Sequence, residues 1–256
     1  MKLERKYVEK PWGRTSLAAM FDPPAGKRIG EVWFTGGTDL PLLAKYIFTS
    51  EALSIQVHPN DEQAKERGLA SGKTECWYIL DAEPDAVLGI GLKKEVAAYE
   101  LRAAALDGSI EQLIDWRPVR RGDFVFVPSG TIHAIGAGIS LLEFQQNADV
   151  TYRLYDYGRP RELHLNDGVA VSDRAPIDPS TVQHVEPGEP RVLVDSKFRL
   201  VASSDDVLAD SRRWVMPISG RVRCGSEVAE AGDVLLANPS EPVEYEDAWA
   251  LTGATA

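Results

Sequence analysis

Gln56 and His58 are spaced as two metal ligands on one β-strand would be. They belong to residues 53–58, which read LSIQVH and alternate between apolar and polar side chains. Successive side chains of a strand point to opposite faces, so Gln56 and His58 would project from the same face. An exposed edge strand without any chemistry would show the same alternation, so this segment alone does not decide between the two interpretations.

A second group of polar side chains leads into the strand that the sequence predicts from Trp77 onward. Extended backbone there would place Lys73, Glu75 and Trp77 on one face. On an exposed face, Lys73 and Glu75 would form a solvated ion pair that contributes little to stability. On the inward face of a barrel, Glu75 would be a buried carboxylate that needs a cation, and a metal ion would supply one.

His133 ends the most clearly patterned stretch of the chain, residues 122–133, which read GDFVFVPSGTIH. A glycine–aspartate turn is followed by an aromatic and β-branched run at 124–127, which predicts a buried strand, and by a turn at 128–130. His133 would therefore open the next strand. A lone histidine near a strand end is more often structural, but the polar side chains found upstream favour a ligand.

These segments together offer a mixed nitrogen and oxygen ligand set. The four candidate ligands are Gln56, His58, Glu75 and His133. Neutral imidazoles, a carboxylate and an amide oxygen suit Zn²⁺, and also Co²⁺, Mn²⁺ or Fe²⁺. Cys76 would lie on the strand face opposite to Glu75, so no thiolate joins them. Three strong ligands and a weak amide leave room for water or substrate, as in catalytic zinc sites.

The composition is that of a soluble globular protein. The chain has 256 residues, of which 44% are hydrophobic and 26% charged, enough for one large or two small domains. The net charge of −11 argues against binding to nucleic acid or to an anionic membrane, so an anionic substrate would need a local cluster of Lys and Arg. Cys76 and Cys224 form no disulfide framework, and no segment resembles a signal peptide or membrane span; we therefore expect a cytoplasmic protein.

Short apolar runs between turn signals, among them the turns at 23–26 and 35–38, predict an all-β sandwich or barrel. Residues 93–116 break this pattern, because helix-forming Ala, Leu, Glu and Lys dominate there. A capping box beginning at Ser109 predicts a second short helix inside this segment. We interpret residues 93–116 as a small helical insertion that covers one end of a barrel.

The carboxy-terminal part repeats one feature of the first. Residues 231–239 read AGDVLLANP and resemble residues 122–128 with one extra residue, and Glu244 falls where the first copy has His133. If this repeat is real, the second copy kept the fold and lost the metal.

The sequence therefore predicts two domains. They are a metal-binding domain over residues 1–175 and a degenerate β domain over residues 190–256. The proline-rich residues 176–189 would link them.

Several motifs make the chain recognisable. The spacing of Gly, Pro, Gly and His in residues 122–133 resembles the second signature of the cupin barrels, in which the histidine binds a divalent metal. The chain as a whole resembles one cupin family, the type I mannose-6-phosphate isomerases in their short bacterial form. The resemblance rests on residues 10–13, 30–33, 53–61, 72–78, 128–135 and 141–159. It implies a cupin-type jelly-roll barrel followed by a second, degenerate cupin-like domain.

The resemblance also implies a function and a set of site residues. It implies interconversion of mannose 6-phosphate and fructose 6-phosphate through an enediolate, with zinc as the expected metal on Gln56, His58, Glu75 and His133. It implies catalytic roles for Lys73, Asp149 and Arg153. Lys73 or Asp149 would move the proton, and the sequence does not choose between them; Arg153 would bind the enediolate or the phosphate as a permanent cation. The expected partner is a small sugar phosphate, and the chain would act as a monomer or homodimer.

Two other functions remain open from the sequence. A cupin with another chemistry, such as a different sugar isomerase or an Fe(II) oxygenase, could use two histidines and a carboxylate. The Lys73, Asp149 and Arg153 group favours an anionic polar substrate instead. A non-catalytic sugar-binding barrel is the other alternative, but such a barrel would be expected to have lost a ligand or the lysine, and none is missing here.

Overall fold

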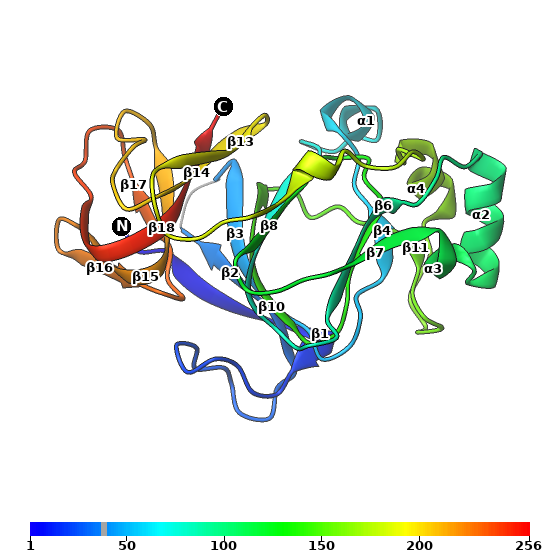
Figure 1. Ribbon diagram of the computed structural model, residues 1–256, viewed down its shortest axis with the longest axis horizontal. Helices are drawn as coiled ribbons and strands as arrows, with labels where there is room; N and C mark the ends of the chain where they lie inside the picture. The colour runs from blue at the N-terminus through cyan, green and yellow to red at the C-terminus, as the bar shows by residue number, and fades with distance from the viewer. Residues whose placement is uncertain (37–39) are drawn as a thin grey trace. The chain divides into compact units, whose positions relative to one another are not determined.

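The computed structural model describes residues 1–36 and 40–256 and is built mainly from antiparallel strands (Figure 1). The all-β prediction is therefore confirmed. Residues 37 and 38 of the predicted turn at 35–38 lie outside the described residues. None of the described helices is both long and apolar enough to cross a membrane.

The chain divides into two compact units, one formed by residues 1–46 with 185–256 and the other by residues 47–184. This grouping differs from the division at residues 175 and 190 that the sequence suggested. The domain boundaries stay a prediction.

The unit of residues 47–184 contains strands of two sheets. Four of them pair in the order β10-β5-β8-β12, and the other five in the order β11-β4-β9-β6-β7. The strands are β4 (Ile55–Val57), β5 (Glu75–Ala82), β6 (Val87–Leu92), β7 (Ile114–Pro118), β8 (Asp123–Val127), β9 (His133–Ile135), β10 (Ile139–Gln146), β11 (Tyr152–Tyr155) and β12 (Val182–His184). The strands predicted around His58, Trp77 and His133 are all present.

The same unit carries the helices. They are α1 (Asp61–Glu66), α2 (Ala98–Asp107), α3 (Ile110–Leu113), α4 (Leu165–Val171) and the 3₁₀ turn η1 (Pro179–Thr181). Helices α2 and α3 lie inside the predicted insertion at 93–116. The capping box predicted at Ser109 is wrong, because the Ser109 side chain makes no cap hydrogen bond. The Ser109 N–H instead donates to the carboxylate of Asp107, which precedes it in the turn.

The helices determine which face of the five-stranded sheet is available for chemistry. Helices α2 and α4 contact β11 and lie beside it in Figure 1. One face packs against α2, α3 and α4, and its buried side chains are Ile55, Val57, Ala134 and Leu154. The alternate residues Gln56, His133 and Arg153 must then point to the opposite face. Gln56 pairs directly with His133 on one side and with Arg153 on the other, so these three side chains form one row.

The other unit is also built from antiparallel strands. They are β1 (Glu4–Arg14), β2 (Ile29–Thr35), β3 (Leu42–Phe48, whose last two residues belong to the unit of residues 47–184), β13 (Arg191–Asp195), β14 (Phe198–Ser203), β15 (Arg213–Cys224), β16 (Glu227–Glu230), β17 (Leu235–Ala237) and β18 (Glu244–Thr255). Strands β13-β14-β18-β15-β16 form a sheet in that order. The amino-terminal strand is held by Asp233, whose carboxylate pairs with Lys2 at 2.7 Å and with Arg5 at 2.6 Å.

The repeat suggested by the sequence is visible in the backbone. Gly122 and Gly232 both have left-handed φ angles, 91° and 92°. After each glycine, the aspartate carboxylate accepts the N–H of the residue three positions earlier, at 2.9 Å for Asp123 and 3.1 Å for Asp233. The two segments therefore form the same turn.

A candidate metal centre

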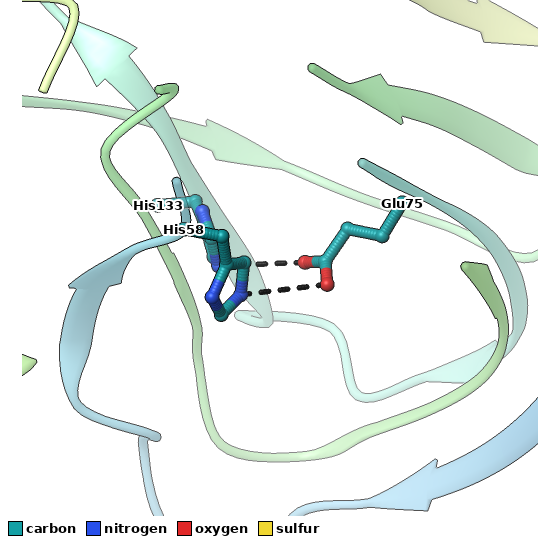
Figure 2. Close-up of side chains that lie close together, drawn as sticks. All are labelled: His58, Glu75 and His133. Atoms are coloured by element: carbon teal, nitrogen blue, oxygen red, sulfur yellow. Dashed lines mark ion pairs between the residues drawn. The ribbon is translucent and has the colours of Figure 1, made fainter. Parts of the chain in front are cut away.

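Three side chains from separate segments meet at one point. His58 follows β4, Glu75 begins β5 and His133 begins β9. His58 Nε2 lies 3.4 Å from Glu75 Oε2, and His133 Nε2 lies 3.4 Å from Glu75 Oε1. Figure 2 shows both imidazole rings turned toward the two carboxylate oxygens. The candidate donor atoms all lie within 4.8 Å of one another.

The chemistry of these donors fits a divalent metal. Atoms bound to one tetrahedral zinc at about 2.0–2.1 Å lie roughly 3.3 Å apart, close to the two separations seen here. All three side chains are only 1% exposed. Two imidazoles and one carboxylate are the ligands of several catalytic zinc sites, and such sites keep a further position for water or substrate.

His133 is prepared for metal binding by its surroundings. Its Nδ1 lies 2.9 Å from the carbonyl oxygen of Thr131. A carbonyl can only accept, so Nδ1 carries the proton and Nε2 presents its lone pair to the cluster. Burial lowers the pKa of His133 to about 4, although the Thr131 hydrogen bond opposes this shift. The imidazole is therefore neutral at pH 7, as a metal ligand must be.

Gln56 lies beside the cluster with its amide turned the other way. Its Nε2 is 3.3 Å from His133 Nε2, and its Oε1 accepts a hydrogen bond from Ser54 Oγ at 3.0 Å. An amide binds a metal through oxygen, so Gln56 would have to rotate its amide group to become a ligand. Its role as a ligand stays a prediction.

Lys73 lies inside the cluster. Its Nζ is 2.5 Å from Glu75 Oε2 and 3.0 Å from His58 Nε2, and the side chain is buried. A buried ammonium so close to the candidate ligands could exchange a proton with a bound substrate.

Arg153 and Asp149 differ in position. Arg153 shares the face of Gln56 and His133, and its Nη1 donates to the carbonyl of Glu162 at 2.8 Å. Its Nε is buried and has no hydrogen-bond partner among residues 1–36 and 40–256. Burial, and then the neighbouring Arg161, lower its pKa, yet an arginine stays charged in proteins. Asp149 is exposed and lines a small pocket after β10.

Sequence reasoning missed two buried polar side chains on the same face of β10. Gln145 pairs directly with Glu75, and Glu143 pairs directly with Trp77. Glu143 Oε2 accepts the Trp77 indole N–H at 3.1 Å, and the Trp77 ring contacts the His133 ring edge-on with centroids 5.4 Å apart. The only sequence signal was this polar pair at i and i+2, in a strand that also contains Ser140 and Gln146.

Comparisons with known proteins agree with this fold. Mannose-6-phosphate isomerase ManA of Bacillus subtilis is 46% identical over an alignment of 221 residues, and the match covers 70% of this chain and 70% of that protein. Mannose-6-phosphate isomerase of Streptococcus mutans is 43% identical over 137 residues, 51% of this chain and 43% of that protein. The crystal structure of mannose 6-phosphate isomerase from Bacillus subtilis superimposes with a TM-score of 0.83 at 26% identity over 98% of both chains.

No family model matches the chain. The sequence relatives and the solved structure nevertheless bear the same description, and they confirm both the cupin-like all-β fold and the family that the motifs indicated. The extent of the similarity to the ManA protein shows that this chain belongs to the mannose-6-phosphate isomerase family.

Proposed function

We propose that this protein interconverts mannose 6-phosphate and fructose 6-phosphate, using one divalent metal held by His58, Glu75 and His133, with Gln56 as a fourth, weaker ligand. The observation that carries the proposal is the buried cluster of two imidazoles and a carboxylate in a chain 46% identical to a mannose-6-phosphate isomerase. Zinc is the metal we propose, because this nitrogen and oxygen set with neutral imidazoles suits it.

The reaction requires three things of the protein. The sugar ring must open, a proton must leave C2, and a proton must arrive at C1. When bound, the metal supplies Lewis-acid stabilisation of the negative charge that develops on the sugar oxygens. The protein must supply a proton shuttle and a fixed positive charge, and it must exclude bulk water.

Lys73 is the shuttle that the geometry favours over Asp149. The Lys73 ammonium lies within hydrogen-bond distance of two proposed ligands, whereas Asp149 is exposed in the loop after β10. A lysine shuttle must give up its proton during turnover, and a divalent metal bound beside the ammonium would assist that loss. Asp149 could still act on substrate at the pocket that it lines.

Arg153 is the fixed cation in this proposal. It extends the row of Gln56 and His133 on the face that carries the metal cluster, and its buried Nε has no partner among the described residues. A planar guanidinium with unused donors suits an enediolate oxygen or a phosphate. A small sugar phosphate is therefore the proposed partner. We also propose a cytoplasmic enzyme that acts as a monomer or homodimer, with the metal-binding domain at residues 1–175, the linker at 176–189 and the second domain at 190–256.

The test combines metal analysis with kinetics on the purified protein. We expect about one zinc per chain and turnover of mannose 6-phosphate in a coupled assay that detects fructose 6-phosphate. Activity should disappear on treatment with a chelator and return with added zinc. Full turnover by a metal-free preparation would refute the catalytic role of the metal. A zinc-loaded protein that does not turn over mannose 6-phosphate would refute the assignment of this substrate.

A further inference from the structure

The segment that carries Lys73 is held by a small hydrogen-bond network centred on Gln146, the last residue of β10. Gln146 Oε1 accepts the backbone N–H of Thr74 at 2.9 Å, and Gln146 Nε2 donates to Asp61 Oδ1 at 2.9 Å. The same Asp61 oxygen accepts the backbone N–H of Gly72 at 2.9 Å. Gln146 and Asp61 therefore bind the two residues that flank Lys73.

Chemistry determines the orientation of the Gln146 amide. A backbone N–H can only donate, so the amide oxygen must face Thr74; an ionised carboxylate can only accept, so the amide nitrogen must face Asp61. Rotating the amide by half a turn would lose both hydrogen bonds. The backbone adds a further link, since the Gln146 N–H donates to the carbonyl of Thr74 at 3.0 Å.

The network also reaches the segment that follows His58. The backbone N–H of Lys73 donates to the carbonyl of Pro59 at 3.0 Å. Gly72 permits this close approach, because a Cβ atom there would lie 2.5 Å from the carbonyl carbon of Asn60 and 2.7 Å from the carbonyl oxygen of Pro59. The backbone around Lys73 is thus held from both sides, by Gln146 and Asp61 and by the carbonyl of Pro59.

We propose that Gln146 and Asp61 are positioning residues that hold Lys73 in place beside Glu75 and His58. The inference rests on the proposed function, in which Lys73 moves the proton. The two residues act through the backbone on either side of Lys73. The candidate ligands have further anchors of their own: Glu75 pairs with Val127, His133 pairs with Gln56, and the His58 carbonyl accepts the Gly130 N–H at 2.8 Å. Because a displacement of about 1 Å in a reacting group can cost about 10²-fold in rate, loosening this network should lower turnover without releasing the metal.

The first experiment replaces Gln146 by alanine in the zinc-loaded 256-residue chain. We expect kcat for mannose 6-phosphate to fall about 10- to 100-fold, while zinc content and KM stay near the wild-type values. Gln63→Ala is the matched control. It removes the capping box of α1, in which Gln63 exchanges hydrogen bonds with Asn60, and leaves the Gln146–Asp61 contact in place. The control should keep the wild-type kcat.

A double-mutant cycle separates positioning from general stability. In a Lys73→Met background, Gln146→Ala should cause no further loss of kcat. The effects of two substitutions are not additive when both residues act through the same step. Equal losses in both backgrounds would overturn the proposal. A merely structural role would lower thermal stability but leave kcat per zinc-loaded molecule unchanged.

A reciprocal exchange provides the rescue. Gln146→Glu alone brings two carboxylates together and should lose turnover. Combining it with Asp61→Asn removes the repulsion and should recover turnover in part, because one Asp61 oxygen accepts both the Gly72 N–H and the Gln146 amide, and an amide atom in its place can serve only one of them. This pair of variants also serves if Gln146→Ala does not fold. A wild-type protein without isomerase activity would refute the proposed function itself. An active wild-type enzyme whose kcat is unaffected by both Gln146→Ala and Gln146→Glu would refute only the positioning role.

Discussion

Replacing His133 by alanine removes one of the two imidazoles from the buried cluster. The ring is 1% exposed, contacts Trp77 and is held by the Thr131 carbonyl, so no neighbouring histidine can take its place without moving a strand. The loss leaves one imidazole and one carboxylate as strong donors. Two strong donors do not make a zinc site of the kind that proteins use for catalysis, which has three.

The size of the effect follows from the linkage between binding and folding. A free zinc concentration 1,000 times the dissociation constant stabilises the folded protein by about 4 kcal/mol. A chain of this length changes its melting temperature by about 2–4 °C for each kcal/mol, so removal of zinc from the wild type should lower Tm by about 8–16 °C. In His133→Ala this chelator-dependent shift should vanish, together with turnover.

The assay compares melting curves with and without a chelator, alongside zinc content. His184→Ala is the matched control, because His184 lies on β12 and pairs with Asp123 at 2.7 Å, away from the cluster. It should keep both the zinc and the Tm shift. If His133→Ala retains one zinc per chain and the wild-type shift, the ion binds elsewhere and the ligand assignment is wrong.

Three further predictions test other parts of the molecule. Lys73→Met should keep its zinc and lose about 10²–10⁴-fold in kcat, the range for a general acid–base group; a rate near wild type would exclude Lys73 as the shuttle. Arg153→Ala should keep its zinc and lose at least about 10²-fold in kcat/KM, and unaltered kinetics would return Arg153 to a structural role. The folded-state pKa of His133, about 4, lies below its ordinary 6.5. The unfolded chain therefore takes up the proton first, and the metal-free protein should lose stability as the pH falls from about 6.5 to about 4. Urea unfolding of the wild type and of His133→Ala measures this, since only the wild type should show this contribution to the pH dependence.

Much of the metal cluster could be predicted from the sequence because its strands have two different faces. In β4, Ile55 and Val57 are buried against the helices, so the intervening Gln56 must face the other way. The same alternation separates Cys76 from Glu75 in β5. A period of two is a local property, and no knowledge of distant contacts was needed to use it.

The residues that sequence reasoning missed lie where this local signal is weak or absent. In β10 the residues on both faces are buried, so Glu143 and Gln145 sit in a run that reads as a core strand. The hydrogen bonds of Gln146 depend on Asp61, 85 positions away in the chain. The pairing of Arg5 with Asp233 spans 228 positions, and it helps to place the first strands in a compact unit with the last ones. Such contacts depend on topology, which periodicity does not contain.

The strand pairing that follows each glycine–aspartate turn explains why the second copy is poorly suited to bind a metal. In the first copy, the residue five positions after Gly122 is Val127, and it pairs with Glu75. In the second copy, the residue five positions after Gly232 is Ala237, and it pairs with Arg213. A guanidinium thus occupies the position that the carboxylate ligand has in the first copy.

Arg213 is fully buried and satisfied within the chain. It forms an ion pair with Asp206 and donates to the carbonyl oxygens of Asn238 and Glu241. A buried cation already paired with a carboxylate repels a divalent ion and leaves it no anionic ligand. Breaking a buried pair from one side costs about 3–5 kcal/mol, so Arg213→Met should lower the free energy of unfolding by that amount without introducing a second zinc. If Arg213→Met retained wild-type stability in urea unfolding, the Arg213 ion pair would not be the feature that keeps a metal out of the second copy. The loss of the histidine, whose position is now taken by the exposed Glu244, would then have to explain that loss of metal binding by itself.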